Sequence, residues 1–198
     1  MHDDAPELIR TLSDGCVRFV KQAVGIELDG TPDTLPILDH YLGLAQDDDA
    51  RRRSEVLGLV TTSAGAYLGE VVRRAFPFAR WHVVPDEPEQ WRIEMDHVFL
   101  SFNPVGMARE AVTGAGEEGW HAHLELLEED RGFVAEALER VGGVREDDYH
   151  RLSIRFEVLE QTVAVLEAAE QARGGNPRRF SAEVYAVALG TAVATKPS

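Results

Sequence analysis

Two histidines and a glutamate are spaced for metal binding in "GWHAHLELL", residues 119–127. On a β-strand His121, His123 and Glu125 share one face, because side chains alternate, and imidazole and carboxylate groups are common zinc ligands. A zinc site needs further ligands. The remaining candidates are His82, Asp96 and His97. The alternatives are a solvated strand face, or a helix in which His121 and Glu125 pair. Because His-x-His alone is a loose pattern, we expect neither a metal nor another cofactor.

A second candidate site is "GAYLGEVVRR", residues 65–74, where Glu70 lies inside an apolar run. A functional interpretation places Glu70 in a small-molecule pocket with Tyr67 and Arg73. A structural interpretation pairs Glu70 with Arg73 or Arg74, since an acid three or four residues before a base stabilises a helix. One carboxylate without an identified partner supports neither acid–base catalysis nor metal binding. We therefore favour a buried, ion-paired Glu70 that ties the helix to a sheet.

Several classes of function lack their sequence signals. The chain contains no Gly-x-Ser-x-Gly motif, and its single cysteine, Cys16, has no local histidine signature. The glycines of "VTGAGEEG", residues 112–119, are not followed by the lysine of a phosphate-binding loop. The longest apolar stretches are short and contain Thr, Ser and Gly, so we expect no membrane span.

The charge of the chain favours a protein partner. Its 35 acidic and 20 basic residues give a formal net charge of −15, which repels nucleic acid and attracts basic protein surfaces. The candidate contacts are Glu128, Glu129, Asp130, Asp147 and Asp148.

Our leading hypothesis is a non-enzymatic interaction protein, such as an adaptor, a regulator or an immunity-type binder of a basic partner. A metal-dependent enzyme based on His121 and His123, or a small-molecule-binding domain that uses Tyr67 and Glu70, are the alternatives. The lone cysteine and the absence of a signal peptide in "MHDDAPELIR" predict a cytoplasmic protein without disulfides. The oligomeric state is not predicted.

Helix signals dominate the first 76 residues. Residues 4–7 have capping-box spacing, and Gly25 is a plausible end for the helix that follows. A second helix begins with Asp33 or Thr34 as its N-cap, because Pro36 must lie in the first turn.

A third, long helix is expected from about residue 49 to residue 76. It is apolar nearly all round and should be the central helix. Gly58, Thr62, Gly65 and Gly69 form a ridge of small side chains along it, and such a ridge lets a neighbouring element approach the backbone closely.

The middle of the chain reads as β-structure. Residues 79–85 form one expected strand, and residues 91–102 form a hairpin around an Asp96–His97 turn. This register pairs apolar residues on one face, namely Met95 with Val98, Ile93 with Leu100, and Trp91 with Phe102. Asn103 should then cap a short helix that begins at Pro104.

The C-terminal part is predicted to be helical. A narrow seam at steps of three and four residues indicates a helical hairpin, with Tyr149, Leu152, Phe156, Leu159, Val163 and Leu166 along it. Ser181 should cap a last helix, on which Phe180 and Tyr185 are placed for a hydrophobic staple. The fold class is therefore α+β: a small antiparallel sheet packed by helices over residues 1–125, and a helical C-terminal region over residues 126–198.

The order of several motifs resembles an uncharacterised bacterial domain. In that domain a Leu-Asp and Ser-Leu segment leads a helix, a Gly-Ala-Tyr-x-Gly-Glu helix follows, and a strand ends in Asn-Pro. The matching positions are Leu28, Asp29, Leu35, Leu38, Asp39, Gly65, Ala66, Tyr67, Gly69, Glu70, Trp81, Asn103 and Pro104. This chain has Thr34 where Ser is usual. The resemblance implies an α+β fold and no particular reaction.

Overall fold

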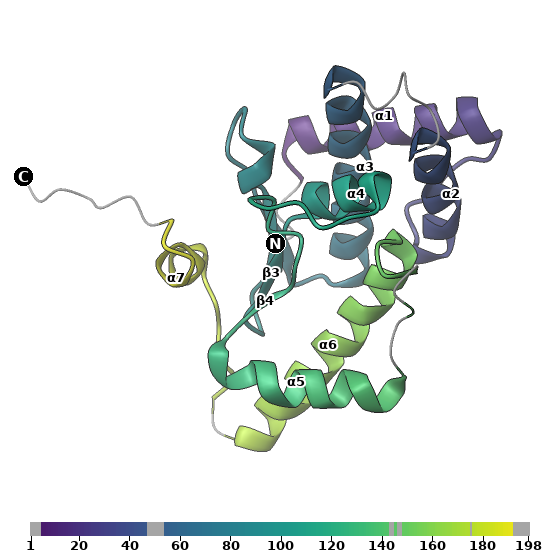
Figure 1. Ribbon diagram of the computed structural model, residues 1–198. Helices are drawn as coiled ribbons and strands as arrows, with labels where there is room; N and C mark the ends of the chain where they lie inside the picture. The colour runs from purple at the N-terminus through teal and green to yellow at the C-terminus, as the bar shows by residue number, and fades with distance from the viewer. Residues whose placement is uncertain (1–4, 47–53, 143–144, 146–147, 175, 192–198) are drawn as a thin grey trace, which may run out of the picture.

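Helices surround a small antiparallel sheet in the computed structural model, which describes residues 5–46, 54–142, 145, 148–174 and 176–191 (Figure 1). The helices are α1 (Glu7–Val24), α2 (Leu35–Gln46), α3 (Ser54–Ala75), α4 (Pro104–Thr113), α5 (Glu128–Val141), α6 (Leu152–Arg173) and α7 (Ala182–Ala188), with short 3-10 turns η1 (Pro32–Thr34) and η2 (Pro88–Gln90). The strands are β1 (Ala79–His82), β2 (Arg92–Met95), β3 (Leu100–Phe102) and β4 (Glu125–Leu126), in the order β1-β2-β3-β4. The predicted α+β class with a helical C-terminal region is confirmed.

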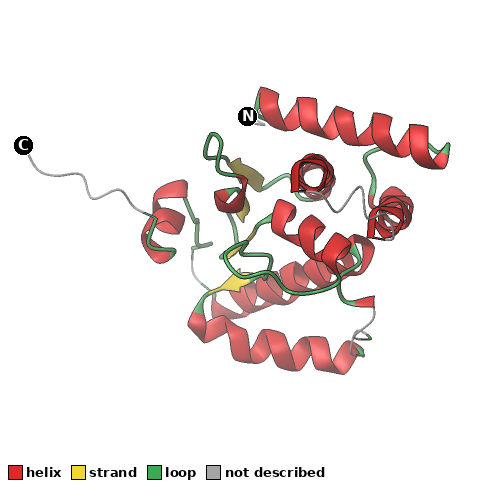
Figure 2. Ribbon diagram, turned by 45° about the horizontal axis from the view of Figure 1, so that its top comes forward, coloured by secondary structure: helices red, strands yellow, loops and turns green. Residues whose placement is uncertain are grey.

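The helices cover the two faces of the sheet unequally. In both ribbon views α2 and α3 lie on one side of the strands, and α7 lies on the other (Figure 2). One apolar core cluster draws residues from α1, α2, α3, the sheet, α4, α5 and α6, so the C-terminal region packs on the same core. No helix within the described residues is both long and apolar enough to cross a membrane.

Helix α3 is central, and two of its glycines allow close contact. A Cβ atom added at Gly65 would lie 2.5 Å from the Val105 Cα atom of α4. A Cβ atom added at Gly69 would lie 2.0 Å from the Trp81 ring of β1. Gly58 faces open space instead, so the predicted ridge acts only over its second half.

Several predicted helix boundaries are present. Gly25 ends α1 in a left-handed conformation with φ of 79°, and Asn103 accepts hydrogen bonds from the amides of Val105 and Gly106 at the start of α4. The proposed capping box includes Asp4, which lies outside the described residues. The second helix starts as η1, and α2 follows directly after Thr34.

The predicted hairpin exists, but its register was wrong by two residues. Ile93 pairs with Phe102 and Glu94 with Ser101, so residues 96–99 form a four-residue loop. The Asp96–His97 pair lacks the preference for positive φ that a two-residue turn requires. A shift of two keeps every side chain on its predicted face, which is why the apolar pattern could not distinguish the two registers.

Tyr185 of α7 stabilises this longer loop. Its buried hydroxyl accepts a hydrogen bond from the Leu100 amide at 2.8 Å and lies 2.8 Å from the Met95 carbonyl oxygen and 3.2 Å from that of Val98. Phe180 and Tyr185, the predicted staple pair, both pack on Phe99.

The predicted seam of α6 is buried from Leu152 to Leu166, whereas Tyr149 precedes the helix and is exposed. The α6 N-terminus is capped from another helix, because the Asp39 carboxylate of α2 accepts from the amides of Leu152 (2.6 Å) and Ser153 (3.1 Å). This bond joins the two halves of the chain.

We predict opposite outcomes for the same substitution at two glycines of α3. Gly69→Ala should lower the free energy of unfolding by about 1–3 kcal/mol, because the new methyl group overlaps the Trp81 ring. Gly58→Ala should raise it by roughly 0.5–1 kcal/mol, because the methyl group meets no atom and alanine favours the helix. Urea denaturation followed by circular dichroism measures both. Equal effects at the two positions would contradict the close contact.

Candidate functional site

The sheet has one apolar and one polar face. Ile93 of β2 faces the helical core, so its neighbours Arg92 and Glu94 point to the opposite face, where Ser101 of β3 joins them. These polar residues are nevertheless buried, with Arg92 8%, Glu94 0% and Ser101 1% exposed. The polar face is covered by the C-terminal segment, residues 176–191. In this segment the Phe180 carbonyl oxygen accepts a hydrogen bond from Arg80, and the Tyr185 ring lies 5.5 Å from the Arg80 guanidinium.

Two arginines share one carboxylate on this face. Glu94 accepts from Nε of Arg80 at 2.9 Å and from Nε of Arg92 at 2.8 Å. Buried charges are stable only when they are paired and hydrogen-bonded. The cluster has two positive charges and one negative charge, so it retains a net positive charge. Burial lowers the pKa of nearby His82, and the charge of Arg92 lowers it further.

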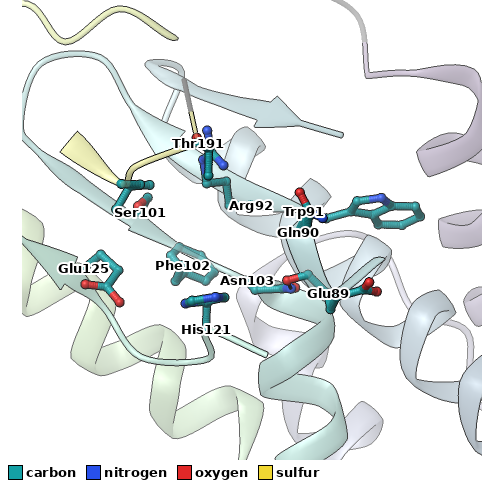
Figure 3. Close-up of a pocket in the computed structure, with 11 residues that line it drawn as sticks. Glu89, Gln90, Trp91, Arg92, Ser101, Phe102, Asn103, His121, Glu125 and Thr191 are labelled. Atoms are coloured by element: carbon teal, nitrogen blue, oxygen red, sulfur yellow. Dashed lines mark hydrogen bonds between the residues drawn. The ribbon is translucent and has the colours of Figure 1, made fainter. Parts of the chain in front are cut away.

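A cavity of about 220 Å³ opens beside this cluster (Figure 3). It lies between η2, the ends of β2 and β3, the segment before β4, and the C-terminal segment. The residues that line it are Glu89, Gln90, Trp91, Arg92, Ser101, Phe102, Asn103, His121, Glu125, Leu189 and Thr191.

Two polar atoms of these lining residues have no hydrogen-bond partner. They are Nη2 of Arg92 and Oγ of Ser101, and both are buried away from bulk water. Leaving a buried donor unpaired costs about 1–3 kcal/mol, so each such group requires an explanation. Because Arg92 and Ser101 are diagonal neighbours on adjacent strands, one oxygen-bearing group in the cavity can serve both.

The backbone is strained at the rim. His121 has φ of 47°, in the left-handed region that residues with a side chain rarely adopt, and its carbonyl oxygen accepts from the Asn103 amide at 2.9 Å. Such strain persists where the surrounding structure holds it, and it clusters at binding sites.

The strand on which His121, His123 and Glu125 would share one face does not form. Strand β4 contains only Glu125 and Leu126, and the positive φ of His121 breaks the alternation that would have aligned the three side chains. Both histidines are exposed. Across the part of the chain that the structure describes, no group of three or more His, Cys, Asp or Glu residues is arranged to hold a metal ion.

Tyr67, Glu70 and Arg73 do not line the cavity; they connect elements of the scaffold. The Tyr67 hydroxyl accepts from the Gly30 amide at 2.9 Å, and burial raises the pKa of Tyr67. Glu70 accepts from the Trp81 indole at 2.9 Å and lies 3.6 Å from Nε of Arg73. The structural interpretation of Glu70 is correct, with Trp81 as an additional partner.

The predicted acidic contacts lie in different environments. Asp130 is buried between Arg173 and Arg178, so it cannot belong to an exposed acidic face. This ion pairing was missed because both arginines lie more than 40 residues away in the sequence. The Glu128 side chain is 87% exposed and that of Glu129 is 61% exposed. Asp148 pairs with Arg151 at 3.3 Å, and Asp147 lies outside the described residues.

Sequence reasoning missed Arg92 and Ser101 as site residues. A signal was present, because "WRIEM" alternates apolar and charged residues and so gives the hairpin a charged second face. That face is covered by α7, which begins more than 80 residues later in the sequence.

Residues 2–99 match a family of unknown function (DUF6278). The DUF6278 match confirms the predicted resemblance to an uncharacterised domain, and it contains the central helix and Arg92. Ser101, His121 and Glu125 lie beyond the matched DUF6278 residues. No curated protein and no solved structure matches the chain.

We predict that Ser101→Ala stabilises the protein. Removing a buried hydroxyl that has no partner should raise the free energy of unfolding by about 1–3 kcal/mol. Ser153→Ala is the matched control and should lower stability, because the Ser153 hydroxyl donates to Asp39. Urea denaturation of ligand-free protein measures both, and a loss of stability in Ser101→Ala would show that its hydroxyl is already satisfied.

Proposed function

We propose that the protein binds a small molecule through an anionic group that occupies the cavity beside Arg92 and Ser101. The observation that carries this proposal is the pair of buried donors without partners, on two residues that line one cavity. Ligand sites are mostly apolar concavities with a few convergent polar groups, and Leu189 supplies apolar wall here.

Charge and geometry favour an anion. Nε of Arg92 is held by Glu94, which fixes the plane of the guanidinium and leaves Nη2 for a ligand. A guanidinium presents fixed donors that match carboxylate geometry. At its Arg92 end the cavity faces the cluster of Arg80, Arg92 and Glu94, whose net positive charge attracts a negative group, while Glu89 and Glu125 line other parts of the cavity.

Binding of a basic protein partner is a second proposed function. It is supported by the net charge of −15 and by the exposed carboxylates of Glu128 and Glu129 at the start of α5. A cytoplasmic location is part of the same proposal. The single cysteine supports it, because a chain with one cysteine cannot form an intrachain disulfide.

We predict that small carboxylates bind at Arg92. Acetate, propanoate and 3-methylbutanoate should stabilise the protein against heat, and Arg92→Gln should weaken their binding about tenfold or more, as expected for a lost charge-assisted hydrogen bond. Isothermal titration calorimetry measures the dissociation constants. Arg140→Gln, which removes an exposed guanidinium outside the cavity lining, is the control and should bind normally. The proposal fails if no carboxylate binds, or if folded Arg92→Gln binds as well as the unaltered protein.

We predict a salt-dependent association rate for the basic partner. Proteins captured from the source cell are tested for association kinetics at low and physiological ionic strength. Glu128→Gln combined with Glu129→Gln should slow association while Asp130 keeps its ion pairs, because exposed charges act mainly on the encounter rate. Glu136→Gln combined with Glu139→Gln, on the same helix, is the control. A rate independent of salt and of Glu128 and Glu129 would contradict this proposal.

A further inference from the structure

The cavity has a negative end as well as a positive end. Glu125 lies directly opposite Ser101 in the β3–β4 pairing, so their side chains share the polar face and their Cβ atoms are about 5 Å apart. Figure 3 shows Glu125 and Ser101 at the same end of the cavity. A carboxylate therefore stands beside the Ser101 hydroxyl, one of the two unpaired donors.

The Glu125 carboxylate is weakly compensated. Its closest described ion-pair contact is Nη2 of Arg131, at 4.0 Å, and Arg131 is itself exposed and bound to Glu128 at 3.0 Å. Exposed pairs at that separation contribute little. Glu125 thus retains the capacity to accept hydrogen bonds from a cation in the cavity.

Size and lining restrict what can occupy the space. Small-molecule sites usually enclose about 300–1,000 Å³, so a cavity of 220 Å³ suits a ligand of only a few heavy atoms. The aliphatic side chain of Leu189 belongs to the cavity lining beside the charged groups, and it suits a short aliphatic substituent.

From these features we infer that the ligand is a small amino acid with an aliphatic side chain, bound as a zwitterion. This inference rests on the proposed function and names its ligand class. The carboxylate accepts hydrogen bonds from Nη2 of Arg92 and Oγ of Ser101. The ammonium group donates to Glu125, one strand away from Ser101, and the aliphatic group lies against Leu189.

The arrangement of Arg92, Ser101 and Glu125 favours a ligand that carries both charges. A ligand that carries both charges satisfies the donors and the acceptor at once, whereas a simple carboxylate leaves Glu125 facing a like charge. Close charges of the same sign are unfavourable, so Glu125 selects against anions that lack an ammonium group.

Three matched probes separate the contributions of the two charges. L-valine carries both groups, 3-methylbutanoate lacks the ammonium group, and 2-methylpropylamine lacks the carboxylate. By isothermal titration calorimetry, L-valine should bind at least about tenfold more tightly than either of the others. Glycine, L-alanine and L-leucine, titrated alongside, report how much aliphatic volume the cavity accepts.

Two variants assign the groups. Glu125→Gln should weaken L-valine binding about tenfold and leave 3-methylbutanoate binding equal or stronger, whereas Ser101→Ala should weaken both. Glu136→Gln, an exposed glutamate of α5 outside the cavity lining, is the control and should change neither.

The outcomes distinguish this inference from the proposed function. If 3-methylbutanoate binds as tightly as L-valine, or if Glu125→Gln affects both equally, the zwitterion inference is overturned while anion binding at Arg92 stands. If neither an amino acid nor a carboxylate binds the folded protein, both are overturned.

Discussion

The structure depends on how closely α3 approaches its neighbours. At Gly65 the backbone of α4 lies where a side chain would be, and at Gly69 the Trp81 ring of β1 does the same. Glu70, the next residue, then accepts a hydrogen bond from the Trp81 indole and fixes the ring in place. Gly69 and this hydrogen bond thus set the distance between the central helix and β1, and Gly65 sets the distance between the central helix and α4. The remaining strands are placed by their pairing, in the order β1-β2-β3-β4.

The residues of the Gly-Ala-Tyr-x-Gly-Glu motif therefore have a structural role, because they hold elements of the fold together. Tyr67 holds the loop at Gly30, Gly69 and Glu70 hold β1, and Asn103 connects the start of α4 to η2 through the carbonyl oxygens of Pro88 and Glu89. A buried polar group that must find a partner restricts substitution as strongly as a catalytic group does. The DUF6278 match over residues 2–99 covers most of these contacts.

Local signals in the sequence predicted local structure well. The Asn103 cap, the end of α1 at Gly25 and the buried seam of α6 each depend on residues within a few positions of one another. What could not be predicted depends on distant partners. Tyr185 fixes the hairpin register. Arg173 and Arg178 account for the burial of Asp130. The C-terminal segment covers the polar sheet face and so buries the unpaired donors of the cavity. An apolar pattern specifies which face of a strand is inside, and it carries no information about what lies on the other side.

The contacts of Tyr185 affect the order in which parts of the protein fold during synthesis. Its hydroxyl bonds to backbone groups between Met95 and Leu100, about 90 residues earlier in the chain. During synthesis the sheet is therefore made long before the residue that locks its loop and covers its charged face. Contacts across such sequence separation form late, and a ribosome-bound intermediate exposes Arg80, Arg92 and Glu94 to water. Because those groups are charged, the sheet face that α7 has not yet covered is hydrated and resists aggregation. A polar sheet face therefore helps the chain during folding as well as in the folded protein.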